Sequence, residues 1–280
     1  MNIHRVSGFS FKNQGGNPAG VVITDEMLSE DKMLEIAKEV NYSETAFLVH
    51  KENKDFRIRY FSPEMEIGFC GHATIASGEI LADKFGYGSY NLEINSGTIK
   101  LDIENINDTK RTAIYSLNTR TESVDKKIVD KFISSFNFSN DDLDNSYPIK
   151  KSYSGNYHLI IFLKSRETLK NMKYDFEKLK ELMREHEITT VSLLWAENDS
   201  TYHSRNPFAY GGVYEDPATG SAAIALAEYL RDTKKKTSGQ IEILQGFDMD
   251  VPSKLYVEYT DEANSSVKVS GESRIIKENK

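Results

Sequence analysis

Apolar residues recur along this chain in two spacings, and each spacing predicts a different secondary structure. Alternating or short continuous apolar runs indicate strands, whereas apolar residues three and four positions apart indicate helices. The expected strands are 2–9, 19–24, 45–50, 56–61, 91–95, 98–103, 157–163, 189–196, 239–244, 254–260 and 266–269. The expected helices are 29–40, 71–84, 124–136, 176–186 and 220–231, the first with Ser29 as its N-cap. Strands and helices are mixed along the whole chain, and we expect a fold of the α+β class.

Two of the expected helices have similar sequences. With Gly71 aligned to Gly220, GHATIASGEILAD and GSAAIALAEYLRD agree at Gly, Ala, Ile, Ala, Glu, Leu and Asp. The same offset aligns residues 92–97 with 241–246, so a helix and the following strand both repeat, as in a duplicated architecture. Both helices are apolar around most of their surface, which is typical of buried helices. We therefore expect two pseudo-symmetric lobes, each a curved, mainly antiparallel sheet wrapped around a central helix.

The length of the chain fits this duplication. Its 280 residues suffice for two domains, because domains usually have about 100–150 residues. We expect an N-terminal lobe of residues 1–118, with a returning strand near 266–280 joined to it, and a C-terminal lobe of residues 119–265. Residues 119–152 are charged and rich in Asn and Ser, which suggests a passage between the lobes. The active-site cleft is expected between them.

Composition and charge exclude several classes of function. The net charge is −8 with acids and lysines interspersed, so nucleic acid is not an expected partner. No apolar run approaches the roughly 18–20 residues of a membrane span, and we expect a cytoplasmic protein that does not contact the membrane. Cys70 is the only cysteine and the six histidines lack paired spacing, so no metal site is expected. Glycine-rich nucleotide-binding motifs are missing from the sequence, and no cofactor is expected.

Both repeated helices begin at a glycine, where no side chain blocks the approach of a ligand. The first N–H groups of a helix have no partner within the helix, and with the positive end of the helix dipole they attract anions. Two such helices facing one cleft would hold a small acidic metabolite without arginine or metal. We expect the residues at these two entrances to bind the substrate: Gly71, Ala73, Thr219, Gly220 and Ser221.

Four motifs carry a resemblance to a known family. They are GNPAGVV at 16–22, SETAFL at 43–48, CGHAT at 70–74 and EDPATGSAA at 215–223. In this order the set resembles the PhzF-like proteins of phenazine biosynthesis. The resemblance implies the diaminopimelate-epimerase-like fold and a homodimer. It also implies an isomerase that moves a proton on a small carboxylate-bearing metabolite without a cofactor.

The resemblance also implies roles for individual residues. Glu44 of SETAFL corresponds to the general acid/base that takes a proton from one carbon and returns it to another. His72 of CGHAT, with Asp216 and Ser221 of EDPATGS, corresponds to residues that hold polar groups of the substrate and assist proton transfer. The namesake substrate, a dihydro-hydroxyanthranilate, is one candidate among many.

The residues alone leave simpler interpretations open. Glu44 could be a surface acid at the start of a strand, because acids are usually solvated. His72 could pack or cap a helix, and Asp216 before Pro217 could form a plain turn. Ser221 in a first helical turn could do no more than satisfy backbone donors.

Three other functions compete with the isomerase. A two-cysteine racemase of the same fold would need a second cysteine opposite Cys70, but the repeat places Thr219 there, and a threonine hydroxyl is too weak an acid. A hydrolase could use Ser221 or Cys70 as nucleophile with His72 as base, although neither residue lies in a recognised nucleophile motif. A non-catalytic protein could bind a small acid in the same cleft, and Glu44 would then be dispensable.

Overall fold

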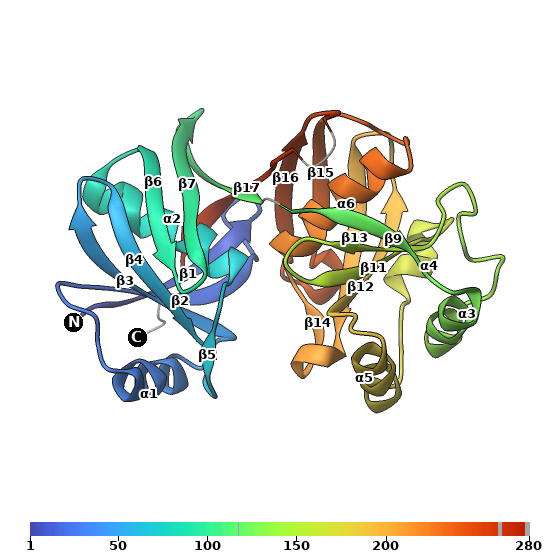
Figure 1. Cartoon of the computed structure of the whole chain (residues 1–280), viewed down its shortest axis with the longest axis horizontal. Helices are drawn as coiled ribbons and strands as arrows, with labels where there is room; N and C mark the ends of the chain where they lie inside the picture. The colour runs from blue at the N-terminus through green and yellow to red at the C-terminus, as the bar shows by residue number, and fades with distance from the viewer. Residues whose placement is uncertain (117, 263–264, 278–280) are drawn as a thin grey trace. The chain divides into compact units, whose positions relative to one another are not determined.

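The computed structural model describes residues 1–116, 118–262 and 265–277, which fold into two compact units (Figure 1). The first unit holds residues 1–115 together with the segment that begins at Ser270. The second unit holds the residues from Ser116 to Val269. The chain therefore enters the second unit once and returns to the first for its last strand.

The first unit is a mixed sheet with one helix inside it and one outside. Its elements are β1 (Ile3–Ser10), β2 (Asn17–Thr24), α1 (Glu30–Val40), β3 (Glu44–Glu52), β4 (Asp55–Phe61), β5 (Glu66–Ile67), α2 (Gly71–Phe85), β6 (Gly88–Ile94), β7 (Gly97–Ile106), β8 (Thr109–Ser116) and the end of β17 (Val267–Ile275). The strand order is β17-β1-β2-β3-β4-β6-β7-β8, with β5 paired to β4. The β2–β3 and β4–β6 pairs are parallel and the other pairs are antiparallel.

Helix α2 is the central helix of this unit, and Figure 1 shows it enclosed by strands. It packs against β1, β2, β3 and β7, and Ile75, Ala76 and Leu81 are fully buried. Helix α1 lies outside the sheet and packs an apolar face that includes Met33 and Ile36 against β3 and β4. Its N-cap is Ser29, as predicted, and the hydroxyl of Ser29 accepts a hydrogen bond from the backbone N–H of Lys32.

From residue 150 onward the second unit has a similar order of strands and helices, with two helices where the first unit has α1. Its elements are β9 (Arg120–Ser123), α3 (Lys126–Ser135), β10 (Lys150–Tyr153), β11 (Tyr157–Phe162), α4 (Arg166–Lys170), α5 (Phe176–Glu185), β12 (Thr190–Ala196), β13 (Thr201–Phe208), β14 (Val213–Asp216), α6 (Gly220–Asp232), β15 (Gly239–Gln245), β16 (Ser253–Tyr259) and the start of β17. The strand order is β9-β10-β11-β12-β13-β15-β16, with β14 paired to β13. The β11–β12 and β13–β15 pairs are parallel.

Helix α6 occupies the same place in this order as α2 does in the first unit. It packs against β9, β10, β11 and β16, and its side chains are buried from Ala222 through Arg231. A separate core of Phe132, Leu159, Leu179 and Leu193 joins α3 and α5 to strands β11 and β12. The prediction that both repeated helices are buried is confirmed.

Several elements differ from the sequence-based expectation. Strands β5, β8, β9, β10, β13 and β14 and the short helix α4 were missed. Residues 119–152, interpreted as a passage around one helix, carry β9 and β10 of the second unit as well as the expected helix α3. Strand β13 is informative, because Ser204, Arg205 and Asn206 are polar yet buried and hydrogen-bond to other buried side chains. Polar residues paired in this way give no hydrophobic alternation for a pattern to detect.

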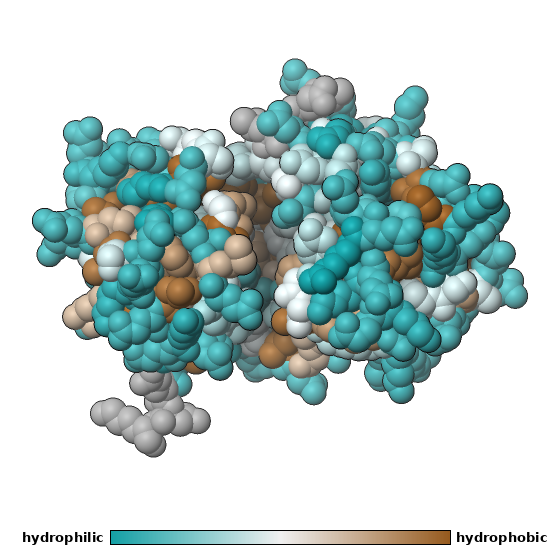
Figure 2. All heavy atoms as spheres, turned by 60° about the horizontal axis from the view of Figure 1, so that its bottom comes forward, coloured by the Kyte–Doolittle hydropathy of each residue, from teal (hydrophilic) through white to brown (hydrophobic). Residues whose placement is uncertain are grey.

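Hydrophilic side chains cover most of the face shown in Figure 2, and hydrophobic side chains gather there only in small separate groups. Within residues 1–116, 118–262 and 265–277, no helix combines the length and the apolar character that crossing a bilayer requires. Most strand pairs in both units are antiparallel, as predicted, but each sheet is mixed because each unit also contains two parallel pairs.

We predict that Gly78→Ala destabilises the protein by about 1–3 kcal/mol, because α2 and β8 meet too closely for a larger side chain. A Cβ at Gly78 would lie 2.2 Å from Oγ1 and 2.5 Å from Cγ2 of the buried Thr112. Urea unfolding of both proteins measures this difference. Gly68→Ala is the matched control, since no atom lies within 4 Å of its Cβ. A Gly78→Ala protein at least as stable as the wild type would contradict the proposed close contact, because alanine otherwise favours a helix.

We predict that His158 makes the stability of the protein fall as the pH is lowered from 6.5 toward 3. His158 is fully buried on β11, and burial lowers its pKa to about 3. The unfolded chain, with a pKa of about 6.5 at this residue, then binds the proton more readily than the folded chain. His158 therefore leaves the free energy of unfolding unchanged above pH 6.5. Below pH 6.5 it lowers the free energy of unfolding by about 1.4 kcal/mol for each pH unit.

His158→Asn tests this effect, because asparagine can still hydrogen-bond to Thr190, whose hydroxyl lies 2.7 Å from Nδ1 of His158, but does not titrate. Between pH 6.5 and 5 the wild type should lose about 2 kcal/mol of unfolding free energy more than the variant. Urea unfolding at both pH values measures the two losses. Parallel pH profiles for the two proteins would overturn the assignment.

Candidate functional site

Three side chains of the first unit converge at the N-terminus of α2. Oε2 of Glu44 lies 3.2 Å from Nε2 of His72. Sγ of Cys70 lies 3.5 Å from the same Glu44 oxygen and 3.4 Å from Nδ1 of His72. Cys70 and His72 are buried, and the Glu44 side chain is 19% exposed. The site therefore places a carboxylate, an imidazole and a thiol in one shielded group.

The local fold explains why these residues meet. Glu44 is the first residue of β3, which runs parallel to β2 with Glu44 opposite Ala19. Cys70 is the N-cap of α2, and His72 is the second residue of that helix. Because β2, β3 and α2 are in contact, the GNPAG, SETAFL and CGHAT motifs form one site although up to 55 residues separate them.

Two further residues orient the imidazole of His72. Nδ2 of Asn17 lies 3.2 Å from Nδ1 of His72, and Oγ of Ser43 lies 3.4 Å from Nε2. A neutral imidazole that accepts from Asn17 at Nδ1 carries its proton on Nε2, where it donates to Glu44. This arrangement keeps the Glu44 carboxylate directed toward the N-terminus of α2.

The first turn of α2 also lies close to strand β1. A Cβ at Gly8 would lie only 2.6 Å from the carbonyl oxygen of His72, so this position of β1 admits no side chain. Sequence reasoning passed over Gly8, although a glycine inside a strand often marks such a close approach.

The two central helices begin differently from the four outer helices. Helices α1, α3, α4 and α5 have a Ser or Asp N-cap whose side chain accepts a hydrogen bond from a backbone N–H. The N-cap side chains of α2 and α6, Cys70 and Thr219, make no such bond. Their first N–H groups therefore keep the capacity to bind an anion.

In the second unit, Asp216 is fixed near the N-terminus of α6. Its Oδ2 accepts a hydrogen bond of 2.5 Å from the hydroxyl of Thr219. Nε2 of Gln245 donates to the backbone oxygen of Asp216 at 2.7 Å and to Oγ1 of Thr219 at 3.0 Å. Oε1 of Gln245 accepts from the N–H of Thr219 at 3.2 Å. The buried Gln245 side chain therefore satisfies a backbone N–H at the start of α6 and holds the EDPATG turn, as an N-cap side chain does in the outer helices.

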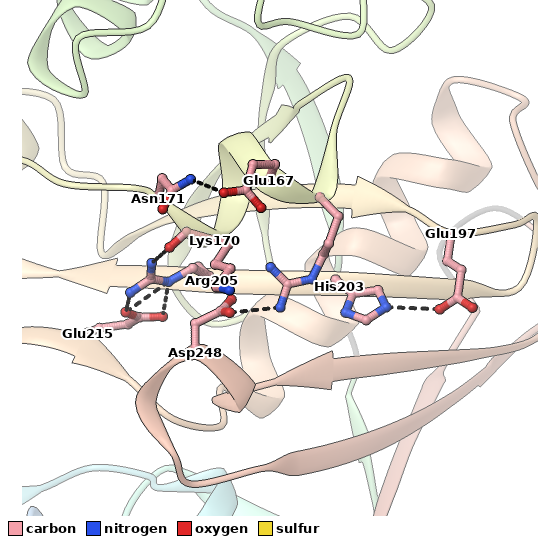
Figure 3. Close-up of polar contacts among 9 residues, drawn as sticks. Glu167, Lys170, Asn171, Glu197, His203, Arg205, Glu215 and Asp248 are labelled. Atoms are coloured by element: carbon pink, nitrogen blue, oxygen red, sulfur yellow. Dashed lines mark hydrogen bonds and ion pairs between the residues drawn. The ribbon is translucent and has the colours of Figure 1, made fainter.

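A buried ion pair holds strand β14 immediately before this turn (Figure 3). Nε of Arg205 donates to Oε1 of Glu215 at 3.0 Å, Nη2 donates to Oε2, and Nη1 donates to the backbone oxygen of Lys170 at 2.9 Å. Burial alone would lower the pKa of Arg205, but the hydrogen bonds and charge of Glu215 raise it above its ordinary value. Glu215 is thereby held in place, and Asp216 follows it directly in the chain.

The predicted site residues fall into two groups. Glu44 and His72 lie together beside Gly71 and Ala73 at the start of α2, and the fully buried Ala73 can offer a ligand only its backbone. Thr219 bonds to Asp216 at the start of α6, next to Gly220 and Ser221 in the chain. The carbonyl of Ser221 accepts a hydrogen bond of 2.6 Å from Ser154. That both groups serve one substrate stays a prediction.

Sequence reasoning missed four residues that shape these groups: Asn17, Ser43, Arg205 and Gln245. Asn17 and Ser43 lie inside the quoted motifs, so their positions were visible although their contacts with His72 were not. Gln245 was part of the internal repeat, opposite Ser96. Nothing in the sequence pattern indicated Arg205.

The first group could also bind a metal ion. Glu44, Cys70 and His72 each offer one ligand atom, and these atoms lie within 4.8 Å of one another. Histidine spacing could not indicate this set, because it contains one histidine and a glutamate 26 residues from the cysteine.

Comparison with known proteins places these features in a family. A model of the PhzC-PhzF family, described as phenazine biosynthesis-like protein, matches residues 6–279. The uncharacterized isomerase YfhB of Bacillus subtilis is 30% identical over 278 residues, which cover 94% of each chain. The trans-2,3-dihydro-3-hydroxyanthranilate isomerase of Pseudomonas chlororaphis is 30% identical over 95% of this chain and 94% of that protein.

A solved structure agrees with this assignment at the level of the fold. The crystal structure of a PhzF-family phenazine biosynthesis protein of Bacillus anthracis superposes with a TM-score of 0.87 at 24% identity, covering 99% of this chain and 98% of that one. The family model spans nearly the whole sequence, and the two relatives are named isomerases. The chain therefore belongs to the PhzC-PhzF family of phenazine biosynthesis-like proteins, and it is an isomerase.

Proposed function

We propose that this chain moves a proton between two carbons of a small carboxylate-bearing metabolite, with Glu44 as the general acid/base. The observation that carries this proposal is the 3.2 Å contact between Oε2 of Glu44 and Nε2 of His72 at the N-terminus of α2. A carboxylate shielded from most solvent, next to an anion-attracting helix end, has the surroundings that proton abstraction beside a carboxylate requires.

In this mechanism the N-terminus of α2 attracts the substrate carboxylate and stabilises the negative charge that develops on deprotonation. Glu44 accepts the proton from one carbon and returns it to another, so its carboxylate is regenerated at the end of the reaction. His72 donates a hydrogen bond to Glu44 through Nε2, while Asn17 fixes the ring through Nδ1. Asp216 and Ser221 bind polar groups of the substrate.

The name of one relative supports a proposal for the substrate class. One relative, the enzyme of Pseudomonas chlororaphis, is named for trans-2,3-dihydro-3-hydroxyanthranilate. We propose a compound of the same kind, a small ring acid with an exchangeable proton, as the substrate here. We further propose that the two units descend from one duplicated unit with the diaminopimelate-epimerase-like fold, and that the enzyme is a cytoplasmic homodimer.

A two-cysteine racemase is disfavoured by the N-caps of the two central helices. Cys70 is the N-cap of α2, and Thr219 is the N-cap at the corresponding position of α6. Proton exchange on opposite faces of a carbon needs two groups of similar acidity, and a hydroxyl does not ionise near neutral pH as a thiol can. Glu44 is therefore the better candidate for the single acid/base.

We predict that Glu44→Gln lowers proton exchange by about 10²- to 10⁴-fold, because glutamine keeps the shape of the side chain but cannot accept the proton. The measurement is incorporation of deuterium into trans-2,3-dihydro-3-hydroxyanthranilate in D2O, followed by mass spectrometry. Glu52→Gln, at the exposed end of the same strand, is the matched control and should exchange at the wild-type rate.

Two results would count against this proposal. Exchange at the wild-type rate in Glu44→Gln would show that Glu44 is not the general acid/base. Binding of the compound by the wild type without any exchange would instead support a non-catalytic binding protein.

We predict that Gln245→Leu weakens both stability and substrate use, because it removes the three hydrogen bonds that the Gln245 side chain makes to Asp216 and Thr219 of the EDPATG turn. Leaving the buried N–H of Thr219 without its acceptor should cost about 1–3 kcal/mol in urea unfolding. Since Asp216 loses its support, KM in the same exchange assay should rise. Gln240→Leu, at an exposed position of β15, is the control. A KM equal to that of the control would show that the turn does not need Gln245.

A further inference from the structure

We propose that Glu44, Cys70 and His72 form a Zn²⁺ site, and that zinc bound there inhibits the proposed isomerase. Sγ of Cys70 lies 3.7 Å from Nε2 of His72 and 3.5 Å from Oε2 of Glu44, and these last two atoms are 3.2 Å apart. Tetrahedral zinc, with bonds of about 2.3 Å to sulfur and about 2.0 Å to nitrogen or oxygen, separates its ligand atoms by about 3.3 to 3.6 Å. These three distances are those expected between zinc ligands, but Sγ of Cys70 is also 3.4 Å from Nδ1 of His72, so the imidazole must turn before the lone pair of Nε2 points at a shared ion.

The chemistry of the three groups also suits zinc. Thiolate, imidazole and carboxylate are its usual ligands, and three protein ligands with an open fourth position are typical of accessible zinc sites. Cys70 is the N-cap of α2, so a zinc-bound thiolate would lie beside the positive end of the helix dipole. Thiolate and carboxylate together bring two negative charges, which offset the charge of Zn²⁺ beside the helix end.

The surroundings of the site complete it. A histidine that binds zinc through Nε2 uses its Nδ1–H to donate to an oxygen. The side-chain amide of Asn17, 3.2 Å from Nδ1, can supply that oxygen after a rotation that exchanges its N and O. Cys70 and His72 are buried while the Glu44 side chain is 19% exposed, so Glu44 is the most exposed of the three groups, and a water molecule would complete the coordination.

Inhibition follows from which atoms the ion would occupy, and this part rests on the proposed function. Zinc would bind Oε2 of Glu44, the atom that must accept the substrate proton, and Nε2 of His72, which donates to it. Binding would also release the thiol proton of Cys70 into solvent. The metal and the proton transfer therefore compete for the same lone pairs.

Direct binding tests the site without any assay of activity. The metal-free full chain is titrated with Zn²⁺ in competition with a chromophoric chelator, and separately with Co²⁺ followed by absorption. We expect one equivalent of zinc per chain, and with Co²⁺ a near-ultraviolet band from the thiolate together with the visible bands of a tetrahedral ion. Cys70→Ala should lower the affinity for zinc by at least about 100-fold and abolish the thiolate band.

His203→Ala is the matched control, because His203 forms a partly exposed histidine–carboxylate pair with Glu197 at 2.9 Å but has no cysteine in its group. Its affinity for zinc should equal that of the wild type. Equal affinity in Cys70→Ala, no stoichiometric zinc in the wild type, or a Co²⁺ spectrum without the thiolate band would each overturn the site.

The inhibitory role is tested separately with the deuterium-exchange assay. One equivalent of Zn²⁺ should abolish exchange in the wild type, and a chelator should restore it. Cys70→Ala, compared with its own metal-free rate, should resist the same concentration of zinc. Exchange that is unchanged or faster with zinc bound would overturn the inhibitory role. Zinc binding by a protein that never exchanges trans-2,3-dihydro-3-hydroxyanthranilate would contradict the proposed function but not the zinc site.

Discussion

Each unit encloses most of one helix within its sheet, and the other features of the site depend on this constraint. Strands approach α2 and α6 from several sides, so the helices carry small or apolar side chains around most of their circumference. Gly78 shows how tight this packing is, because Thr112 occupies the space that a side chain would need. A helix enclosed in this way can meet a ligand only where it begins or ends, and its beginning carries N–H groups that need an acceptor.

The two units use the beginning of the helix differently. In the first unit, the N-terminus of α2 gathers a carboxylate, an imidazole and a thiol from three segments of the chain, and their close spacing in a shielded place strengthens each electrostatic interaction. In the second unit, the corresponding N-cap is a threonine tied to Asp216, and the buried amide of Gln245 holds both. The two units thus place different groups at the beginning of their central helices: a carboxylate, an imidazole and a thiol in the first, and a hydrogen-bonded threonine, aspartate and glutamine in the second.

Buried polar pairs hold the segment before α6 in place. An ion pair removed from water is stabilising only if its partners satisfy each other and the remaining donors find acceptors. Arg205 meets this condition, because its guanidinium bonds to both oxygens of Glu215 and to the backbone of Lys170. Asn206 likewise forms hydrogen bonds with Ser192 on the neighbouring strand β12 and with Ser204 on its own strand β13. Strand β14 and the turn after it are therefore fixed by polar contacts that take the place of an apolar core.

The sequence by itself determined the α+β composition, the two buried glycine-led helices and the motifs that belong to the PhzC-PhzF family, because apolar periodicity and local motifs are properties of neighbouring residues. It also identified Glu44, His72 and Asp216 as candidates through those motifs. Only the tertiary structure decided that Asn17, Ser43 and Cys70 share a site with Glu44 and His72, and that Arg205 and Gln245 support Asp216. These contacts join residues distant in the chain, and their polar side chains are buried in pairs, so no pattern along the sequence could distinguish them from solvated surface residues.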